Sequence, residues 1–181
     1  SNGIRDLSSS LETLDQVLIR PTADTPLTPL AVNDVLQQFD TVQRCQQVPT
    51  SLNVSGKRRL PAVAATDTGL MHVLLVLVVN AVEAIGTQTG GLVSTTASSE
   101  NGIVISVEDN GPGLAPEVAD RIFEPFVTTK DTPGAGLGLS AARWLLEGWG
   151  GGIRYDKPES GQGCRFTVRL RTWAKRATPR I

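Results

Sequence analysis

Residues 107–140 read VEDNGPGLAPEVADRIFEPFVTTKDTPGAGLGLS. The stretch opens with an acidic, glycine-rich turn, DNGPG at 109–113, and closes with a second glycine turn, GAGLG at 134–138. Glycines let backbone N–H groups approach phosphates because no Cβ stands in the way. A helix that begins near Gly138 would direct its positive end to the same place. A carboxylate at a strand end, such as Asp109, can accept a hydrogen bond from the amino group of a base. The stretch therefore predicts a nucleotide pocket.

The composition is typical of a soluble globular protein. The chain has 181 residues, of which 40% are hydrophobic and 19% charged, so we expect one domain with an appendage. The net charge of −1 provides no overall field that would attract nucleic acid, and no nucleic-acid partner is expected. The single histidine, His72, excludes a metal site with several histidine ligands. Cys45 and Cys164 lack metal-binding spacing, which predicts free thiols in a reducing compartment. We expect a cytoplasmic location, which includes the cytoplasmic part of a membrane-bound protein.

Both ends of the chain differ from its centre. Residues 4–19 carry apolar side chains at alternating spacings of three and four, which predicts a helix with a narrow apolar seam. A single helix of this length cannot bury its seam alone, so pairing with a second copy is favoured over packing on the following domain. The expected division is a helical segment at 3–20, a proline-containing linker at 21–29, a central domain at 30–171 and a basic tail at 172–181.

Hydrophobic periodicity predicts both helices and strands in the central domain. A helix over 30–47 is expected to have Asn33 as its N-cap, and a long buried helix over 67–85 is expected to be capped by Asp67. The other expected elements are strands at 51–55, 92–98, 102–108, 153–157 and 164–170, a short helix at 116–122 and a helix at 138–149. Strands adjacent in sequence, with helices between the pairs, predict an α+β two-layer sandwich with helices on one face of a mixed, mainly antiparallel sheet.

Two common phosphate-binding motifs do not account for the glycine turns. The pattern G-x-x-x-x-G-K-[ST] is absent from the sequence. A dinucleotide fingerprint is nominally present as Gly136-x-Gly138-x-x-Ala141, with Asp156 downstream, but that motif should follow directly on a buried strand. The preceding residues, TTKDTP at 128–133, are unsuitable for a strand. The dinucleotide interpretation is therefore disfavoured.

Four ordered segments together resemble the catalytic, ATP-binding domain of sensor histidine kinases. This domain belongs to the superfamily that includes gyrase, Hsp90 and MutL, and the resemblance implies its Bergerat fold over about residues 27–171. One short glycine motif would be weak evidence, whereas four motifs in this order are specific. The segments are VNAVEA at 79–84, similar to the N box; DNGPG at 109–113, similar to the G1 box; IFEPF at 122–126 with TTK at 128–130, similar to the F box; and GLGLS at 136–140, similar to the G2 box.

The resemblance implies a role for each motif. Asn80 would coordinate the Mg²⁺ that bridges the phosphates of ATP, and Asp109 would accept from the adenine amino group. Lys130 would approach the terminal phosphate, although it could also be a solvated loop lysine. Residues 114–135 would form a mobile lid anchored on the core by two phenylalanines, Phe123 and Phe126. The implied catalytic residues are Asn80 and Lys130, and the implied ATP-binding set is Asn80, Glu83, Ala84, Asp109, Gly111, Gly113, Leu114, Thr129, Lys130, Gly134, Gly136, Leu137, Gly138 and Leu139.

The sequence departs from the family pattern at several positions. Many histidine kinases have a polar residue one helical turn before the N-box asparagine, and hydrolytic relatives have a water-activating glutamate there. Here the residue is Val76, which can neither ligate a metal nor take a proton. Cys164 stands where relatives often have threonine, and Ala135 replaces a common threonine in the G2 box. Hydrolysis of ATP in the manner of gyrase is therefore not expected.

The remaining expectations concern partners. His72 lies inside the ATP-binding segment, where we expect it to be partly exposed and without chemistry, so the phosphoacceptor histidine should lie upstream of residue 1. The resemblance implies an upstream phosphoacceptor helical domain, a homodimer formed through the N-terminal helix, and a response regulator receiver domain. Two alternatives remain open: a non-catalytic nucleotide sensor or scaffold of the same fold, and an ATP hydrolase of the gyrase or Hsp90 class.

Overall fold

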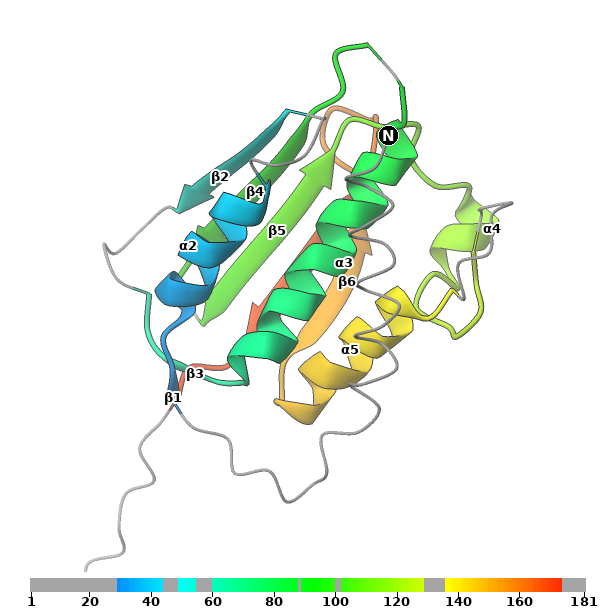
Figure 1. Cartoon of the computed structure of the whole chain (residues 1–181). Coiled ribbons are helices and arrows are strands. Elements are labelled where there is room, and N and C mark those ends of the chain that lie inside the picture. The colour runs from blue at the N-terminus through cyan, green and yellow to red at the C-terminus, as the bar shows by residue number, and fades with distance from the viewer. Residues whose placement is uncertain are drawn as a thin grey trace, which may run out of the picture.

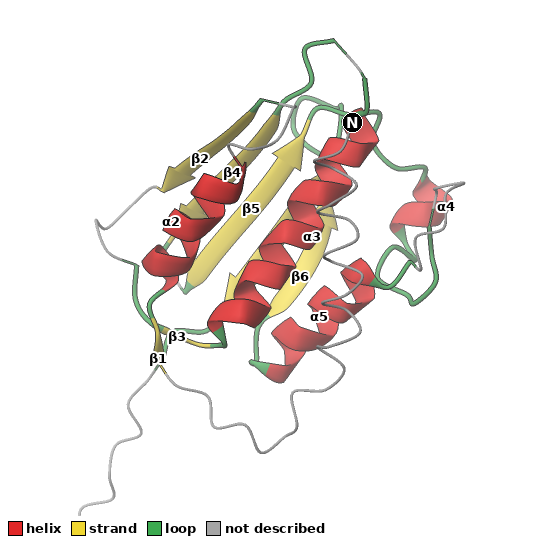
Figure 2. Cartoon of the chain, in the orientation of Figure 1, coloured by secondary structure: helices red, strands yellow, loops and turns green. Residues whose placement is uncertain are grey.

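The computed structural model describes residues 29–43, 49–54, 60–87, 89–99, 102–128 and 136–173, with the side chains of 42 and 43 excepted. The described chain folds into two layers, a sheet and a set of helices that lie on one of its faces (Figures 1 and 2). The helix predicted for 3–20 lies outside the described residues, as does the tail from 174 onward.

The main sheet has five strands in the order β2-β4-β5-β7-β6 (Figure 2). Only β2 runs parallel to its neighbour β4, and the other three pairs are antiparallel. Side chains alternate along β5, where Ile103, Ile105 and Val107 are buried on the helix side. The mixed, mainly antiparallel sheet is thus confirmed. Its strands are β2 Thr50–Val54, β4 Val93–Ser98, β5 Ile103–Asp109, β6 Gly152–Asp156 and β7 Arg165–Leu170.

Three helices, α2 Val32–Gln43, α3 Asp67–Ile85 and α5 Gly138–Gly148, lie side by side across this sheet (Figure 1). α3 is central and contacts both α2 and α5 as well as β5. A fourth helix, α4 Pro116–Ala119, is shorter than predicted and lies to one side of the layers (Figure 1). The predicted α+β two-layer sandwich with helices on one face is confirmed.

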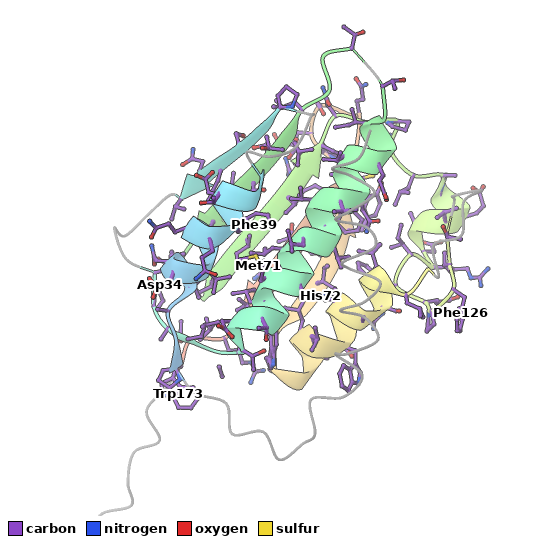
Figure 3. The ribbon with its side chains drawn as sticks, viewed as in Figure 1. Asp34, Phe39, Met71, His72, Phe126 and Trp173 are labelled. Atoms are coloured by element: carbon purple, nitrogen blue, oxygen red, sulfur yellow. The ribbon has the colours of Figure 1, made fainter. Side chains whose placement is uncertain are left out.

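α3 forms the centre of the core. With 19 residues, this helix is long and apolar enough to cross a membrane, and its most apolar 18-residue segment has a mean hydropathy of 1.9. Two thirds of that segment is buried within the protein. Side chains from several of its faces, including Leu70, Val73 and Leu77, are fully buried because helices flank α3 and the sheet lies beneath it. His72 is 1% exposed on this helix, so the expectation of a partly exposed histidine is wrong (Figure 3).

Two predicted helix caps are also wrong. Thr66 caps α3, since its Oγ1 accepts from the Gly69 N–H at 3.2 Å, and Asp67 is the first helical residue. Asn33 lies inside α2, and its Oδ1 accepts from the Leu60 N–H at 2.7 Å. Asn33 therefore fixes a distant loop instead of starting the helix.

A small second sheet lies at the edge of the domain. β1 Pro29–Leu30 pairs antiparallel with β3 Val63–Ala64, and Thr172 forms a bridge with Val63 from the other side. The N–H of Trp173 donates to Ala62 O at 2.6 Å, and Figure 3 shows Trp173 near β1. Pro29, the last residue of the predicted linker, is thus already part of this sheet.

Candidate nucleotide-binding site

One face of α3 lies against Gly111 and Gly138, which belong to the two glycine turns of residues 107–140. Val76, Asn80 and Ala84 are four residues apart and therefore lie on the same face of the helix. A Cβ built on Gly138 would lie 3.2 Å from Val76 Cγ1, and a Cβ built on Gly111 would lie 3.6 Å from Ala84 Cβ. Asn80 is consequently placed between the two turns. We call the two regions the Asp109 end (109–113 with 163–164) and the Gly138 end (136–139 with Val76).

Asp109 is the last residue of β5 and is 5% exposed. Its Oδ1 accepts from the Gly111 N–H at 2.9 Å and from the Cys164 N–H at 3.3 Å. Its own N–H donates to Cys164 O at 2.9 Å. Burial raises the pKa of this carboxyl above its usual 3.8, while the two backbone N–H groups partly oppose the shift. Among the described residues both hydrogen bonds end on Oδ1, which leaves Oδ2 for a ligand.

Close backbone packing at the Asp109 end requires glycine. Gly163 has a φ of +85°, and a Cβ there would collide with the carbonyl oxygen of Asp109. Gly113, at a φ of +80°, approaches Gly163 in turn, and a Cβ on it would lie 3.2 Å from Gly163 O. A Cβ on Gly111 would lie 2.9 Å from Asp109 Oδ1. The glycines of this turn therefore allow two loops and a carboxylate to pack against each other.

Asn110 was not selected by sequence reasoning, yet it holds the same turn from both sides. Its Oδ1 accepts from the Leu92 N–H at 2.7 Å and its Nδ2 donates to Gly90 O at 2.9 Å. Its carbonyl oxygen accepts from Gln162 Nε2 at 3.2 Å. The available signal was an Asn-Gly pair after a strand, which also occurs in ordinary turns. These partners lie 18 to 52 residues away in sequence, so spacing alone did not reveal them.

The Gly138 end is built differently. Gly136 has a φ of +59°, and its carbonyl oxygen accepts from the Phe126 N–H at 3.0 Å. The first turn of α5 follows, where Ser140 Oγ donates to Leu137 O at 2.8 Å. Leu139 packs on Val76 and Val79 in a small apolar cluster. This end therefore offers backbone amides and apolar contacts.

The segment between the ends is anchored on the core by one phenylalanine. Phe123 meets Phe166 edge to face, with ring centroids 6.2 Å apart, and the Arg143 guanidinium lies 5.9 Å from the Phe123 centroid. Phe126 is 74% exposed at a φ of +67°, so its predicted role as a core anchor is wrong. Figure 3 shows Phe126 at the outer edge of the segment that carries α4, away from the sheet. Leu114 also packs on the core.

The remaining predicted residues have mixed outcomes. Glu83 is half-buried and Ala84 exposed on the face of α3 that carries Asn80. Thr129, Lys130 and Gly134 lie outside the described residues. Cys164 uses its backbone to hold Asp109, and burial together with the nearby Asp109 charge raises the pKa of its thiol to about 12. The thiol is therefore neutral at physiological pH.

The donor set limits how a metal could bind. Within the described ranges, no group of three or more His, Cys, Asp or Glu side chains could hold an ion. Asn80 is a half-buried residue on the face between the turns, and its side chain carries an amide oxygen. Mg²⁺ is commonly held by one or two protein ligands together with phosphates and waters. The described residues fit such a phosphate-bridging ion, and they do not fit an all-protein metal cage.

Residues 65–174 match the protein family described as histidine kinase-, DNA gyrase B-, and HSP90-like ATPases. The chain belongs to this ATPase family. Its sequence is similar to sensor histidine kinase ZraS from Escherichia coli O157:H7, with 38% identity over 140 residues that cover 77% of this chain and 29% of ZraS. It is also similar to the sensory histidine kinase/phosphatase NtrB from Rhizobium meliloti, with 33% identity over 78% of this chain and 40% of NtrB. The chain thus spans less than half of either relative.

Solved structures place this ATPase-family chain among histidine kinase catalytic domains. The catalytic domain of histidine kinase ThkA superposes with a TM-score of 0.67 at 30% identity and covers 81% of this chain and 95% of that domain. Full-length ShkA in complex with AMPPNP superposes with a TM-score of 0.65 at 33% identity, over 82% of this chain and 32% of ShkA. These matches confirm the predicted Bergerat fold and the resemblance to the ATP-binding domain of sensor histidine kinases.

Proposed function

We propose that this chain is the ATP-binding catalytic domain of a two-component sensor histidine kinase. It transfers the γ-phosphate of ATP to a histidine outside residues 1–181. The observation that carries the proposal is the placement of Asn80 on α3 between the turn at Gly111 and the turn at Gly138, with the buried Asp109 at one end. Such a site orders a base, a row of phosphates and one amide ligand along a single helix face. The central domain at 30–171 is the unit that binds the nucleotide.

In this proposal Asp109 selects adenine. Its Oδ1 is held by two backbone N–H groups, so Oδ2 accepts from the exocyclic amino group of the base. Gly111, Gly113 and Leu114 form the wall beside the base, together with Ala84 at the end of α3. At the other end, the backbone amides of Gly136, Leu137, Gly138 and Leu139 receive the phosphates at the N-terminus of α5.

Transfer requires positioning and charge neutralisation more than covalent assistance. Asn80 would hold Mg²⁺, which when bound neutralises charge on the phosphates. Glu83 lies on the same helix face and would belong to the ATP-binding residues. Lys130 and Thr129 would approach the terminal phosphate from the lid at 114–135, and Gly134 would be a further ATP-binding residue of that segment. Val76 is 4% exposed and has no group that could activate water, which favours transfer over hydrolysis.

The partners follow from the same proposal. The phosphoacceptor histidine belongs to an upstream helical domain, residues 3–20 contribute to a homodimer, and the phosphate passes on to a response regulator receiver domain. The domain acts in the cytoplasm. The apolar cluster of Val76, Val79 and Leu139 supports a second candidate, a nucleotide sensor that binds ATP without transferring phosphate.

Calorimetric titration of the chain with ATP, with and without Mg²⁺, tests the binding site. We expect tighter binding with Mg²⁺, and we expect Asn80→Ala to remove that enhancement. Asn53→Ala is the matched control, because Asn53 is an exposed asparagine on β2 and far from the site in sequence and sheet order. An enhancement that survives Asn80→Ala would contradict the metal role. Full-length protein incubated with labelled ATP then separates the candidates, since a sensor binds ATP but leaves the upstream histidine unlabelled.

A further inference from the structure

Asn110 joins three segments at the Asp109 end. Its amide side chain accepts from the Leu92 N–H at 2.7 Å and donates to Gly90 O at 2.9 Å. Its backbone N–H donates to Leu92 O at 3.3 Å. On the opposite side, its carbonyl oxygen accepts from Gln162 Nε2 at 3.2 Å, in the loop that leads to Cys164. The residue directly after Asp109 is thus tied to the turn before β4 and to the loop before β7.

We infer that Asn110 is a positioning residue for base selection, fixing the direction in which the Asp109 carboxylate faces the pocket. The inference deepens the proposed function and rests on it, because it concerns the same adenine site. The Asp109 side chain is held directly, because the N–H groups of Gly111 and Cys164 donate to its Oδ1. Asn110 holds the following peptide, so the backbone that carries the carboxylate is fixed before and after it.

Only an amide side chain satisfies both contacts with the 90–92 turn. The Leu92 N–H needs an acceptor and Gly90 O needs a donor, and asparagine supplies both on a short stem. Aspartate would keep the acceptor but bring a second oxygen toward Gly90 O, and alanine would remove both groups. Leu92 is 46% exposed, so packing of its side chain does not replace these bonds. Loss of the amide should therefore loosen the turn at Asp109 without creating a cavity in the hydrophobic core.

The test compares adenosine triphosphate with inosine triphosphate, which carries a carbonyl oxygen in place of the exocyclic amino group. Dissociation constants for both nucleotides are measured by calorimetry on the whole chain, together with the midpoint of thermal unfolding. The unmodified chain should prefer the adenine nucleotide by about tenfold or more, as expected for a charge-assisted hydrogen bond. In Asn110→Asp and Asn110→Ala this preference should fall to about twofold, because the carboxylate is no longer held toward the amino group.

Asn33→Ala is the matched control. Asn33 also uses its side-chain oxygen to hold a distant backbone N–H, that of Leu60 at 2.7 Å, but it does so on α2. This variant should lower the unfolding midpoint while the nucleotide preference stays as in the unmodified chain. Gln162→Ala provides a second approach to the same turn, since Gln162 is exposed and its loss should spare the fold. It should reduce the preference by about twofold, in keeping with one neutral hydrogen bond.

The outcomes separate this inference from the function on which it rests. Unchanged preference in the Asn110 and Gln162 variants overturns the inference alone. Equal loss of preference in Asn33→Ala also overturns it, because the effect would then follow general stability. An unmodified chain that binds both nucleotides equally overturns the role of Asp109 as well, and a chain that binds neither overturns the proposed function.

Discussion

The two ends of the candidate site are built on opposite principles. At the Asp109 end, a buried carboxylate is held by backbone N–H groups, and Asn110 ties the adjoining peptide to two other loops. At the Gly138 end, the described contacts are mainly apolar, with Leu139 packed on Val76 and Val79, and one backbone bond joins Gly136 to Phe126. The first end is fixed by long-range hydrogen bonds, whereas the second presents the start of a helix.

This difference matches what each end would have to do. A base is recognised by direction, so its acceptor must not move, and the two buried hydrogen bonds to Asp109 Oδ1 achieve that in a region of low dielectric. Phosphates are bound by charge and by backbone amides, which tolerate small shifts. Changes to the backbone packing at the Asp109 end should therefore destabilise the fold, and changes to the Asp109 carboxyl should reduce affinity and selectivity for the base. Changes at the Gly138 end should have a smaller effect on nucleotide binding.

The largest effect is expected from Gly163→Ala. The new Cβ would collide with Asp109 O, and the residue would have to keep a φ of +85°, so the free energy of unfolding should fall by about 3 kcal/mol or more. Gly161→Ala is the matched control, because Gly161 also has a positive φ of +77° but nothing within 4 Å of the added Cβ. It should cost only about 1 kcal/mol. Urea unfolding followed by circular dichroism measures both, and equal losses would show that the Asp109 end is less tightly packed than described.

Asp109→Asn should separate binding from stability. ATP affinity should fall about 10- to 100-fold with the loss of a charge-assisted hydrogen bond. The free energy of unfolding at pH 7 should stay equal or rise, because burial penalises the ionised carboxyl, as its raised pKa indicates. Asp34→Asn on the exposed surface of α2 serves as the control for both measurements (Figure 3). A clear loss of stability in Asp109→Asn would mean that the carboxylate holds the turn together instead of serving a ligand.

Acid should weaken ATP binding through the same residue. The pKa of Asp109 is raised by burial above 3.8, so its ionised fraction falls at a higher pH than for an ordinary carboxyl. Below the raised pKa, affinity should drop by up to about tenfold per pH unit. The stability contribution changes in the opposite direction, since the folded chain binds this proton more readily than the unfolded chain. Calorimetric titrations with ATP at several pH values test this pH dependence. Asp109→Asn serves as the reference, because it reports the effect of protonating ATP itself. Identical pH profiles for the two proteins would exclude Asp109 as the titrating group.

The smallest effect on nucleotide binding is expected at the Gly138 end. Val76→Asn would place an amide on the α3 face that carries Asn80, and Mg²⁺-dependent ATP affinity should rise about threefold, in keeping with one added hydrogen bond. Since Val76 is 4% exposed, the substitution should also cost about 1–3 kcal/mol of stability. Val79→Asn, at 8% exposure in the same cluster, should carry a comparable cost without the gain. A gain in both variants, or in neither, would show that this end does not distinguish the two positions.

Sequence periodicity predicted the elements of the fold well, because burial imposes it directly. The alternation of Ile103, Ile105 and Val107 gave β5, and the all-round apolar α3 was predicted to its last residue, Ile85. The cap of α3 was mispredicted because two cap-forming residues, Thr66 and Asp67, are adjacent, and local sequence does not choose between them.

The candidate site was predictable only where motifs name its residues. The glycine turns and Asn80 were selected in this way as candidates, and the structure places them along one helix face. The supports of Asp109 were missed because Asn110 binds partners that become neighbours only after the sheet has formed. Phe126 was mispredicted for a related reason. Its side chain is as apolar as that of Phe123, but its backbone has a φ of +67° and its side chain points outward.

The burial of His72 has a practical consequence. This side chain is the chain's one histidine and is 1% exposed inside α3, so solvent and nucleotide do not reach its ring in the folded protein. If the chain is mixed with a separately produced acceptor, any alkali-stable, acid-labile radiolabel can be attributed to the acceptor without a histidine-free variant. Trans-phosphorylation assays can therefore use the native sequence without a separate control for labelling of this chain's own histidine.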